Sequence, residues 1–358
     1  MDWSADKIRA FRKTLLSWYD KEGRDLPWRV DHNPYHVLVS ELMLQQTQVQ
    51  TVIPYYQRFI AQFPTVAALA AAPEADVLKA WEGLGYYSRA RNLQKAAQQL
   101  MAEHGGEWPT TAPELLKLSG IGPYTAGAIA SIAFNQPEPA IDGNAFRVFA
   151  RLFCIPDDIT LPKTRRVFDT LIRQVIDPDR PGDFNQAIMD LGSTYMRAKD
   201  PDAAHSPVAA FDESLAIDRV LDFPVKTKKK PPVAVPYFAL VVHSEQGYLM
   251  VQRPSKGMLA GLWMFPLVKR ETLEDDSPAG ASAAFAEIVG AALPFADHGF
   301  ALVKHTFTHQ QWQMTLLTAE ATAFDVEALG GRWVSDAKMD ELAIPTVQKK
   351  LMRALKVK

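Results

Sequence analysis

The sequence predicts two domains, an all-α domain over about the first 220 residues and an α+β domain after a linker. Apolar residues recur at helical intervals up to about residue 220, whereas beyond residue 236 they alternate as in β-strands. Between them, residues 223–232 (FPVKTKKKPP) combine charges and prolines without an apolar face, which is typical of an exposed linker. We therefore expect a helical domain over 1–222, a linker over 223–235 and an α+β domain over 236–358.

The first domain is expected to begin with an amphipathic helix that starts after the possible cap Ser4 and ends near Gly23. Apolar residues at helical intervals over 34–63 predict two helices, broken by Pro54 and Pro64. Further helices, each bounded by Pro, Gly or Thr, are expected at 66–69, 74–82, 88–104, 113–118 and 125–133, with two more over 163–192.

The second domain is expected to start with a β-hairpin formed by residues 237–242 and 248–252 around the turn 244–247. Two more strands are predicted at 305–309 and 312–317, and a closing helix at 347–355. The acidic and then alanine-rich stretch 274–292 predicts a loop and one helix.

Composition restricts the class of protein. The chain has 358 residues, of which 47% are hydrophobic and 22% charged, as in globular proteins. A formal net charge of -2 does not indicate a general polyanion binder, so any contact with nucleic acid must come from local groups. One cysteine excludes an internal disulfide and an all-cysteine metal site, and indicates a reducing compartment. Without a signal region or about 18 consecutive apolar residues, we expect no membrane association and a location in the bacterial cytosol.

A glycine turn precedes the most apolar predicted helix. Gly120 and Gly122 frame the turn, and the residues that follow are small and apolar. The first amides of a helix lack intrahelical partners, and glycine lets another backbone come close, so this turn is a candidate phosphate site.

Two carboxylates are candidates for acid–base chemistry. Glu41 lies in an otherwise apolar helical turn, where burial would raise its pKa and keep it protonated; the alternative is a Glu on a solvated face. Asp142 stands at a helix start, where backbone N–H groups favour its charged form, and by itself such an Asp is usually a cap. Together, an acid and an anion are what cleavage of a glycosidic bond requires.

The segment 83–91 (GLGYYSRAR) sets glycines, aromatic residues and two arginines at a helix start. Such a segment is suited to wedge a base stack with arginines near phosphates, although an ordinary loop with an aromatic anchor has the same composition.

These segments occur in one order that resembles a known superfamily. The first 220 residues are similar to helix-hairpin-helix DNA glycosylases, with residues 118–122 (LSGIG) as the hairpin. Four further segments resemble the signatures of the adenine DNA glycosylase family, namely 26–29 (LPWR), 40–49 (SELMLQQTQV), 83–90 (GLGYYSRA) and 142–144 (DGN). The resemblance implies contacts with DNA or with a flipped adenine from Trp28, Arg29, Gln46, Gly85, Tyr86, Arg89, Gly120 and Gly122.

The resemblance also implies how the reaction proceeds. Glu41 would protonate adenine at N7, while Asp142, oriented by Asn144 and Tyr124, would stabilise the sugar cation or bond to it transiently. In endonuclease III-like relatives a lysine nucleophile occupies the position of Tyr124. Without an amine there, no Schiff base can form at this position, so we expect base release without strong strand cleavage. The alternatives are a bifunctional glycosylase/lyase and a non-catalytic lesion-binding protein.

The second domain resembles the Nudix-like domain of the same family, which implies recognition of 8-oxoguanine opposite adenine. Residues 255–266 (SKGMLAGLWMFP) match its loop, and Phe307, Thr308 and His309 match its lesion-reading segment; the alternative for these three is an ordinary edge strand. The metal-binding run of Nudix hydrolases is not found between residues 269 and 290, so we expect no nucleotide hydrolysis. The implied partner is duplex DNA containing an adenine:8-oxoguanine mispair, bound by a monomer.

The family's four cluster-binding cysteines are missing. The corresponding positions are Tyr195, Asp202, His205 and Phe211, which cannot supply the four thiolates of a [4Fe–4S] cluster. Asp202 and His205 alone would make a poor metal site. We therefore expect no cofactor and no metal, with side-chain packing by Tyr195 and Phe211 holding this loop instead.

Overall fold

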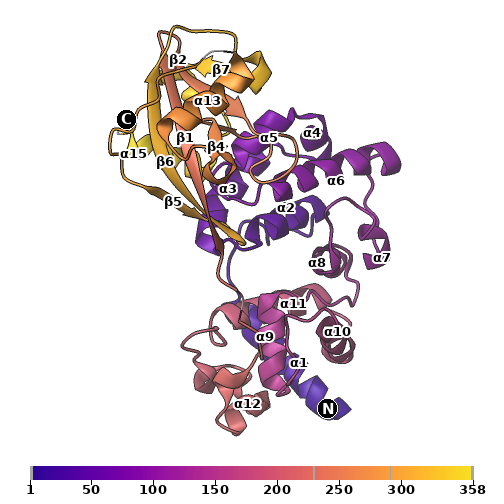
Figure 1. The fold of residues 1–358 in the computed structure, drawn as a ribbon. Helices are drawn as coiled ribbons and strands as arrows, with labels where there is room; N and C mark the ends of the chain where they lie inside the picture. Colours follow the sequence, from indigo (N-terminus) through magenta and orange to yellow (C-terminus); the bar gives the residue numbers. More distant parts are fainter. Residues whose placement is uncertain (1–2, 229, 291, 356–358) are drawn as a thin grey trace. The chain divides into compact units, whose positions relative to one another are not determined.

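The computed structural model describes residues 3–228, 230–290 and 292–355. The described chain divides into two compact units, one formed by residues 3–72 and 91–228 and the other by residues 73–90 and those after 229 (Figure 1). Residue 229 of the predicted linker, residue 291 of the predicted helical stretch and the two chain ends lie outside the described residues. Among the described residues, no helix combines the length and apolar character needed to cross a bilayer.

The first unit is helical, as predicted. Its α-helices are α1 (Ala5–Glu22), α2 (Pro34–Leu44), α3 (Val49–Gln62), α4 (Val66–Ala71), α6 (Ser88–His104), α7 (Ala112–Leu115), α8 (Pro123–Phe134), α9 (Gly143–Leu152), α10 (Thr164–Val175), α11 (Pro181–Ser193) and α12 (Glu213–Ala216). The predicted helix at 74–82 is α5 (Glu74–Ala80), which belongs to the second unit. Ser4 caps α1 by accepting from the Lys7 amide at 3.2 Å, and Gly23 ends it.

The break between α2 and α3 lies elsewhere than predicted. Pro54 is inside α3, and the chain leaves the helix earlier, where Gln46 adopts a φ of 58°. Proline removes the bond to the carbonyl four residues before it, but that carbonyl belongs to Gln50, which is exposed to water. The predicted break at Pro54 is therefore wrong, and Glu41 instead stands in the last turns of α2, close to its real end.

Three buried helices pack closely around the segment that carries Asp142. Helix α8 is buried over most of its length, and α11 contacts both α8 and α9. A Cβ at Gly192 of α11 would overlap the side chain of Asn144, so only glycine lets α11 approach the start of α9 this closely. Helices α9 and α11 share one core with α1 and α10, which includes Phe11, Phe149 and Phe184.

The second unit contains a mixed sheet. The described strands run in the order β3–β2–β1–β6–β5, with β4 beside β1 and β7 beside β2. Their bounds are β1 (Val233–Ser244), β2 (Gly247–Gln252), β3 (Trp263–Met264), β4 (Leu267–Lys269), β5 (Val303–Thr306), β6 (Gln310–Glu320) and β7 (Gly331–Val334). The predicted hairpin is confirmed, because β1 and β2 pair antiparallel with Ser244 opposite Gly247.

Both faces of this sheet are covered by apolar residues. Alternate residues of β1 divide between two cores, with Ala239 and Val241 on one side and Phe238 and Leu240 on the other. Helix α15 (Thr346–Ala354) packs into the first core, and helix α13 (Pro278–Val289) packs into the second (Figure 1). The closing helix and the helix within 274–292 are therefore confirmed.

Three features of the second unit differ from the sequence prediction. Strand β5 ends at Thr306, so residues 307–309 form the turn to β6 and the edge-strand interpretation of this segment is wrong. The short strands β3, β4 and β7 were not predicted, because they contain too few residues for a period to be recognised. Strand β1 begins at Val233, within the predicted linker, and Phe223 is buried in the helical core.

The loop after α11 contains the positions where relatives would carry cluster cysteines. Tyr195 packs edge-on against Trp18 at 6.1 Å between ring centroids, and Phe211 packs against Phe11 at 5.5 Å. Asp202 and His205 pair with each other at 2.7 Å. Two packed rings and one Asp–His pair do not fit a cluster that needs thiolate ligands.

Phe211 is expected to stabilise this loop. Phe211→Ala should lower the free energy of unfolding by about 2 kcal/mol, below the 3–5 kcal/mol typical of a fully buried Phe, because this side chain is half-buried. The measurement is the melting temperature. Leu221→Ala is the control because Leu221 is 72% exposed, and its melt should not change. An unchanged melt for Phe211→Ala would remove the packing role.

Candidate active site

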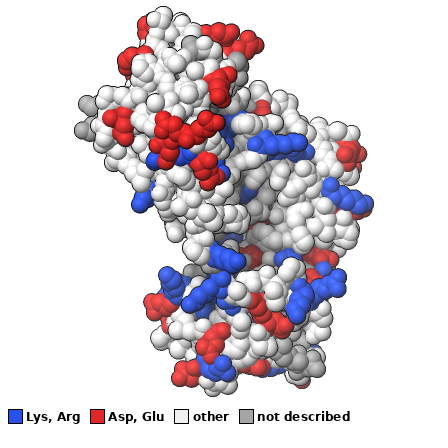
Figure 2. All heavy atoms as spheres, viewed as in Figure 1, with Lys and Arg blue, Asp and Glu red and all other residues white. Residues whose placement is uncertain are grey.

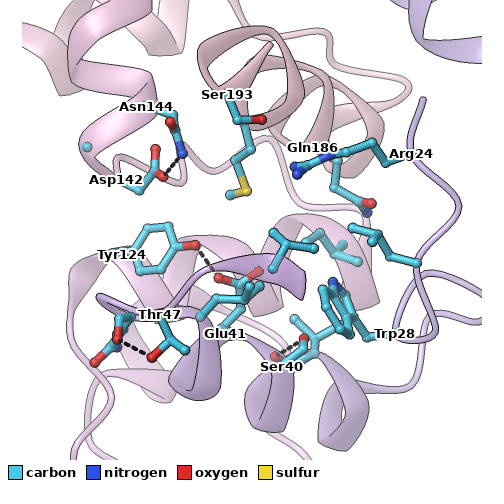
Figure 3. Close-up of a pocket in the computed structure, with 18 of the residues that line it drawn as sticks. Arg24, Trp28, Ser40, Glu41, Thr47, Tyr124, Asp142, Asn144, Gln186 and Ser193 are labelled. Atoms are coloured by element: carbon cyan, nitrogen blue, oxygen red, sulfur yellow. Dashed lines mark hydrogen bonds between the residues drawn. The ribbon is translucent and has the colours of Figure 1, made fainter. Parts of the chain in front are cut away.

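A cavity of about 510 Å³ in the first unit gathers the predicted catalytic residues (Figure 3). Its walls come from the loop after α1, the end of α2, the start of α8, the start of α9 and one face of α11. Predicted residues that line it are Trp28, Arg29, Glu41, Gln46, Tyr124, Asp142 and Asn144. In Figure 3, Asp142 and Asn144 lie on one side of the cavity, and Glu41 and Tyr124 lie on the other.

Glu41 is a buried acid. Glu41 is only 4% exposed, so the alternative of a Glu on a solvated helix face is wrong. The pKa of the Glu41 carboxyl is raised to about 7, chiefly because the group is buried; the charge of Asp142 also raises this pKa, while the Tyr124 hydrogen bond and Arg29 lower it. Near neutral pH a large share of Glu41 is therefore protonated and can donate a proton.

Asp142 is the N-cap of α9, as predicted. Its carboxylate accepts hydrogen bonds from the Ala145 amide and from the Asn144 side chain, both at 2.7 Å. Arg147 in turn binds the amide oxygen of Asn144 at 2.7 Å, which fixes the orientation of that amide. Contrary to the expectation that N–H groups would favour the charged form overall, burial raises the pKa of Asp142, and the hydrogen bonds oppose this only in part.

Tyr124 has a different partner from the one expected. The sequence interpretation had it orient Asp142, but its hydroxyl donates a short hydrogen bond to Glu41 (Figure 3). Burial raises the pKa of Tyr124 well above its ordinary value, so the phenol keeps its proton as a donor. Tyr124 therefore positions the acid, and Asn144 positions the anion.

The end of the cavity away from Asp142 contains charged and polar residues, some of which the sequence motifs did not indicate (Figure 3). Arg29 lines the cavity as predicted, and its guanidinium binds both carboxylate oxygens of Asp190, at 2.8 and 2.9 Å. Arg24 and Gln186 also line the cavity, and Gln186 accepts from Tyr19 at 2.9 Å. Asp190 was not predicted as a site residue; a carboxylate between apolar residues of a buried helix was the available signal.

Activity should fall as pH rises through the pKa of Glu41, because the protonated form is the acid. The single-turnover rate of a reaction that uses this proton is expected to fall about tenfold per pH unit above about pH 7. A pH profile of that rate measures this, with substrate binding checked at each pH. A rate that stays level from about pH 6 to about pH 9 would contradict this role.

The glycine hairpin forms a tight turn at the start of α8, and its role as a phosphate site stays a prediction. Gly120 has a φ of 73°, and a Cβ at this position would overlap Asn92, so glycine is required there. Gly122 is the N-cap of α8, and its carbonyl accepts from the Ala126 amide at 2.9 Å. Gln46 lies at an exposed left-handed position, a backbone conformation that is rare outside glycine and common at functional sites.

The remaining predicted residues lie in the second unit. Tyr86, also in the left-handed region and 48% exposed, follows Gly85, and its hydroxyl lies 3.2 Å from the Thr308 hydroxyl. Thr308 and His309 are exposed, while the Phe307 ring packs edge-on against Trp312 at 4.8 Å. The structure therefore brings the predicted wedge and the predicted lesion-reading segment together.

Arg89 does not have the predicted phosphate role. It is 6% exposed, and its guanidinium donates to the carbonyls of Leu84 and Gly85 at 3.1 and 3.0 Å. Burial lowers the pKa of Arg89 to about 10. Arg89 therefore supports the loop that carries Tyr86 from within, and it cannot reach a phosphate without leaving these carbonyls.

Charged side chains of both signs are mixed on the visible face of the molecule (Figure 2). Figure 2 shows Lys and Arg interspersed with Asp and Glu on the visible face, without one continuous basic surface. Within the described ranges, no group of three or more His, Cys, Asp or Glu side chains is arranged to hold a metal ion.

Comparison with known proteins agrees with this geometry. The HhH-GPD superfamily base excision DNA repair protein family matches residues 39–174, and the NUDIX domain family matches residues 237–354. The chain is 38% identical to an adenine DNA glycosylase of Rattus norvegicus over 97% of this chain and 78% of that protein. It is 37% identical to the Homo sapiens protein of the same name over 97% and 74%. A thermostable thymine-DNA glycosylase, 24% identical with a TM-score of 0.55, covers 60% of this chain with its entire length and shows the same fold.

Proposed function

Because the chain belongs to the adenine DNA glycosylase family, we propose that it removes adenine mispaired with 8-oxoguanine or guanine from duplex DNA by hydrolysing the N-glycosidic bond. The observation that carries this is one cavity with a buried acid, Glu41, on one side and a carboxylate held by two N–H donors, Asp142, on the other. A non-catalytic lesion-binding protein would have no use for this pair.

Base release begins with a flipped adenine in the cavity lined by Trp28 and Arg29. Glu41 gives its proton to N7, so the protonated base accepts the electrons of the breaking C1′–N9 bond and leaves as neutral adenine. Asp142 stabilises the positive charge that develops on the sugar. Water then adds to C1′ and loses a proton, which leaves an abasic site and free adenine.

The proposed reaction ends at the abasic site. Strand cleavage by a bifunctional relative requires an amine that forms a Schiff base, and Tyr124 occupies the position where that amine would stand. Its phenol is already engaged with Glu41. This contact supports base release without lyase activity.

The second unit supports a role in reading the lesion strand. Thr308 and His309 are exposed beside Tyr86, which lies at a strained backbone position. We propose that Tyr86 and Gln46 each wedge the base stack, while residues 307–309 distinguish 8-oxoguanine from guanine. The proposed partner is one DNA duplex per copy of the chain, in the reducing cytosol that the single cysteine indicates.

The proposed enzyme works without a cofactor. The packed rings of Tyr195 and Phe211 and the Asp202–His205 pair support the absence of an iron–sulfur cluster. Iron content and visible absorbance of purified protein test this: iron bound in stoichiometric amount would contradict it.

Single-turnover assays on matched duplexes test the function. The panel places adenine opposite 8-oxoguanine, adenine opposite guanine, and thymine opposite guanine. We expect adenine release that is fastest opposite 8-oxoguanine, no thymine release, and strand breaks only after hot alkali. Strand cleavage with a borohydride-trapped complex would favour the bifunctional alternative, and tight binding without release would favour the non-catalytic one.

A further inference from the structure

Asp190 is a buried carboxylate beside the active-site cavity, and each of its two oxygens accepts more than one hydrogen bond. Its side chain is 1% exposed on α11. It accepts from the Arg29 guanidinium at 2.8 and 2.9 Å, from the Arg24 Nε at 2.7 Å and from the Arg24 amide at 3.0 Å. Each oxygen therefore has at least two donors, which explains why the pKa of Asp190 is lowered despite its burial.

Arg29 is the cation that acts on both carboxylates. Its side chain is 11% exposed, so its charge is poorly screened by water. It lowers the pKa of Glu41 and is itself bound by Asp190. The other charged or titratable groups acting on Glu41 are Tyr124 and Asp142, while Arg24, Arg29 and Tyr19 face Asp190.

We propose that Asp190 is a positioning residue for catalysis, which holds Arg29 and offsets its positive charge so that Glu41 remains protonated as the general acid. The proposal rests on the proposed function for the identity of the reaction. Without this carboxylate, the charge of the Arg29 guanidinium would be left without its partner in the cavity that Glu41 also lines, and ionisation of Glu41 would be favoured. Asp190 thereby protects the acid form while it leaves Arg29 available to line the adenine pocket.

A purely structural role must be distinguished from this one. Asp190 also binds the backbone amide of Arg24, so it anchors the segment between α1 and α2 that carries Trp28. Loss of that anchor alone would lower the rate by the same factor at every pH. Loss of charge pairing would instead move the pH at which the rate falls.

The test is the pH profile of single-turnover adenine excision by Asp190→Asn. We expect the falling limb to move to lower pH by about one unit, which is about a tenfold loss at alkaline pH and recovery toward the wild-type rate at acidic pH. Asp183→Asn on the same helix is the matched control, because Asp183 pairs with Arg180, away from the cavity. Its profile should match the wild type.

The second variant measured in the same assay is Arg29→Gln. Removing the cation should move the falling limb to higher pH, and Asp190→Asn added to Arg29→Gln should no longer produce the downward shift. An NMR titration of the Glu41 carboxyl, identified by its loss in Glu41→Gln, gives the same comparison without any assay of activity. The proposal is overturned if Asp190→Asn leaves the falling limb of the pH profile in place. It is also overturned if Asp190→Asn shifts this limb by the same amount in the Arg29→Gln background. A wild type that releases no adenine overturns the proposed function instead, while the NMR comparison still decides the role of Asp190.

Discussion

Glu41→Gln is expected to bind its duplex and to lose base excision by about 10²–10⁴-fold, the usual contribution of a general acid. The amide has nearly the shape of the carboxyl but no proton to give to N7. Because Glu41 is buried and its pKa is about 7, the substitution removes little charge from the surface that meets DNA. Affinity for an adenine:8-oxoguanine duplex should therefore change by no more than about twofold.

Single-turnover excision and equilibrium binding, measured on the same duplex, separate the two effects. Glu103→Gln is a suitable control, because Glu103 is an exposed residue of α6 that pairs with Gln99. It should excise at the wild-type rate. If Glu41→Gln also excises at that rate, Glu41 is not the acid.

Asp142→Asn is expected to lower the excision rate by about 10²–10³-fold, because a neutral amide cannot stabilise the cation that develops on the sugar. Asparagine is as good an N-cap as aspartate, so α9 should keep its start and the protein its melting temperature. A second consequence follows from the charge of Asp142, which raises the pKa of Glu41. The falling limb of the pH profile should therefore move to lower pH in this variant.

Asp212→Asn controls for the loss of a buried capping carboxylate. Asp212 is 2% exposed, caps α12 by accepting from the Leu215 amide at 3.1 Å, and is not among the residues that line the cavity. Equal losses of excision in the two variants would mean that Asp142 acts through folding. An Asp142→Asn enzyme with full activity would exclude its electrostatic role.

Several predictions from periodicity were correct because periodicity reports burial. The helices around Glu41 and Asp142 and the hairpin of β1 and β2 follow from local apolar spacing and turn residues. The position of the break between α2 and α3 was not predicted correctly from local sequence, because proline in a helix is costly only where the lost hydrogen bond cannot be replaced by water. Short strands such as β3 and β7 depend on pairing with distant segments, which local sequence does not record.

The direction in which a side chain points could also not be predicted from the sequence. Arg89 was predicted to contact DNA, but its guanidinium donates to the carbonyls of Leu84 and Gly85. Tyr124 was predicted beside Asp142 but donates to Glu41. Both errors have one cause: a motif gives the order of residues along the chain, whereas a hydrogen bond depends on where the backbone places each Cβ.

The residue types of this chain alone determine that it has an acid, an anion, a glycine hairpin and no amine at position 124, because these are covalent facts of the sequence. Only the tertiary structure decides that Glu41 is protonated near neutral pH and that Asp190 pairs with Arg29. Both depend on burial and on charges brought together from segments more than a hundred residues apart. The pKa shift of Glu41 and the Asp190–Arg29 ion pair therefore exist only after folding has buried these side chains around the cavity between α2, α8, α9 and α11.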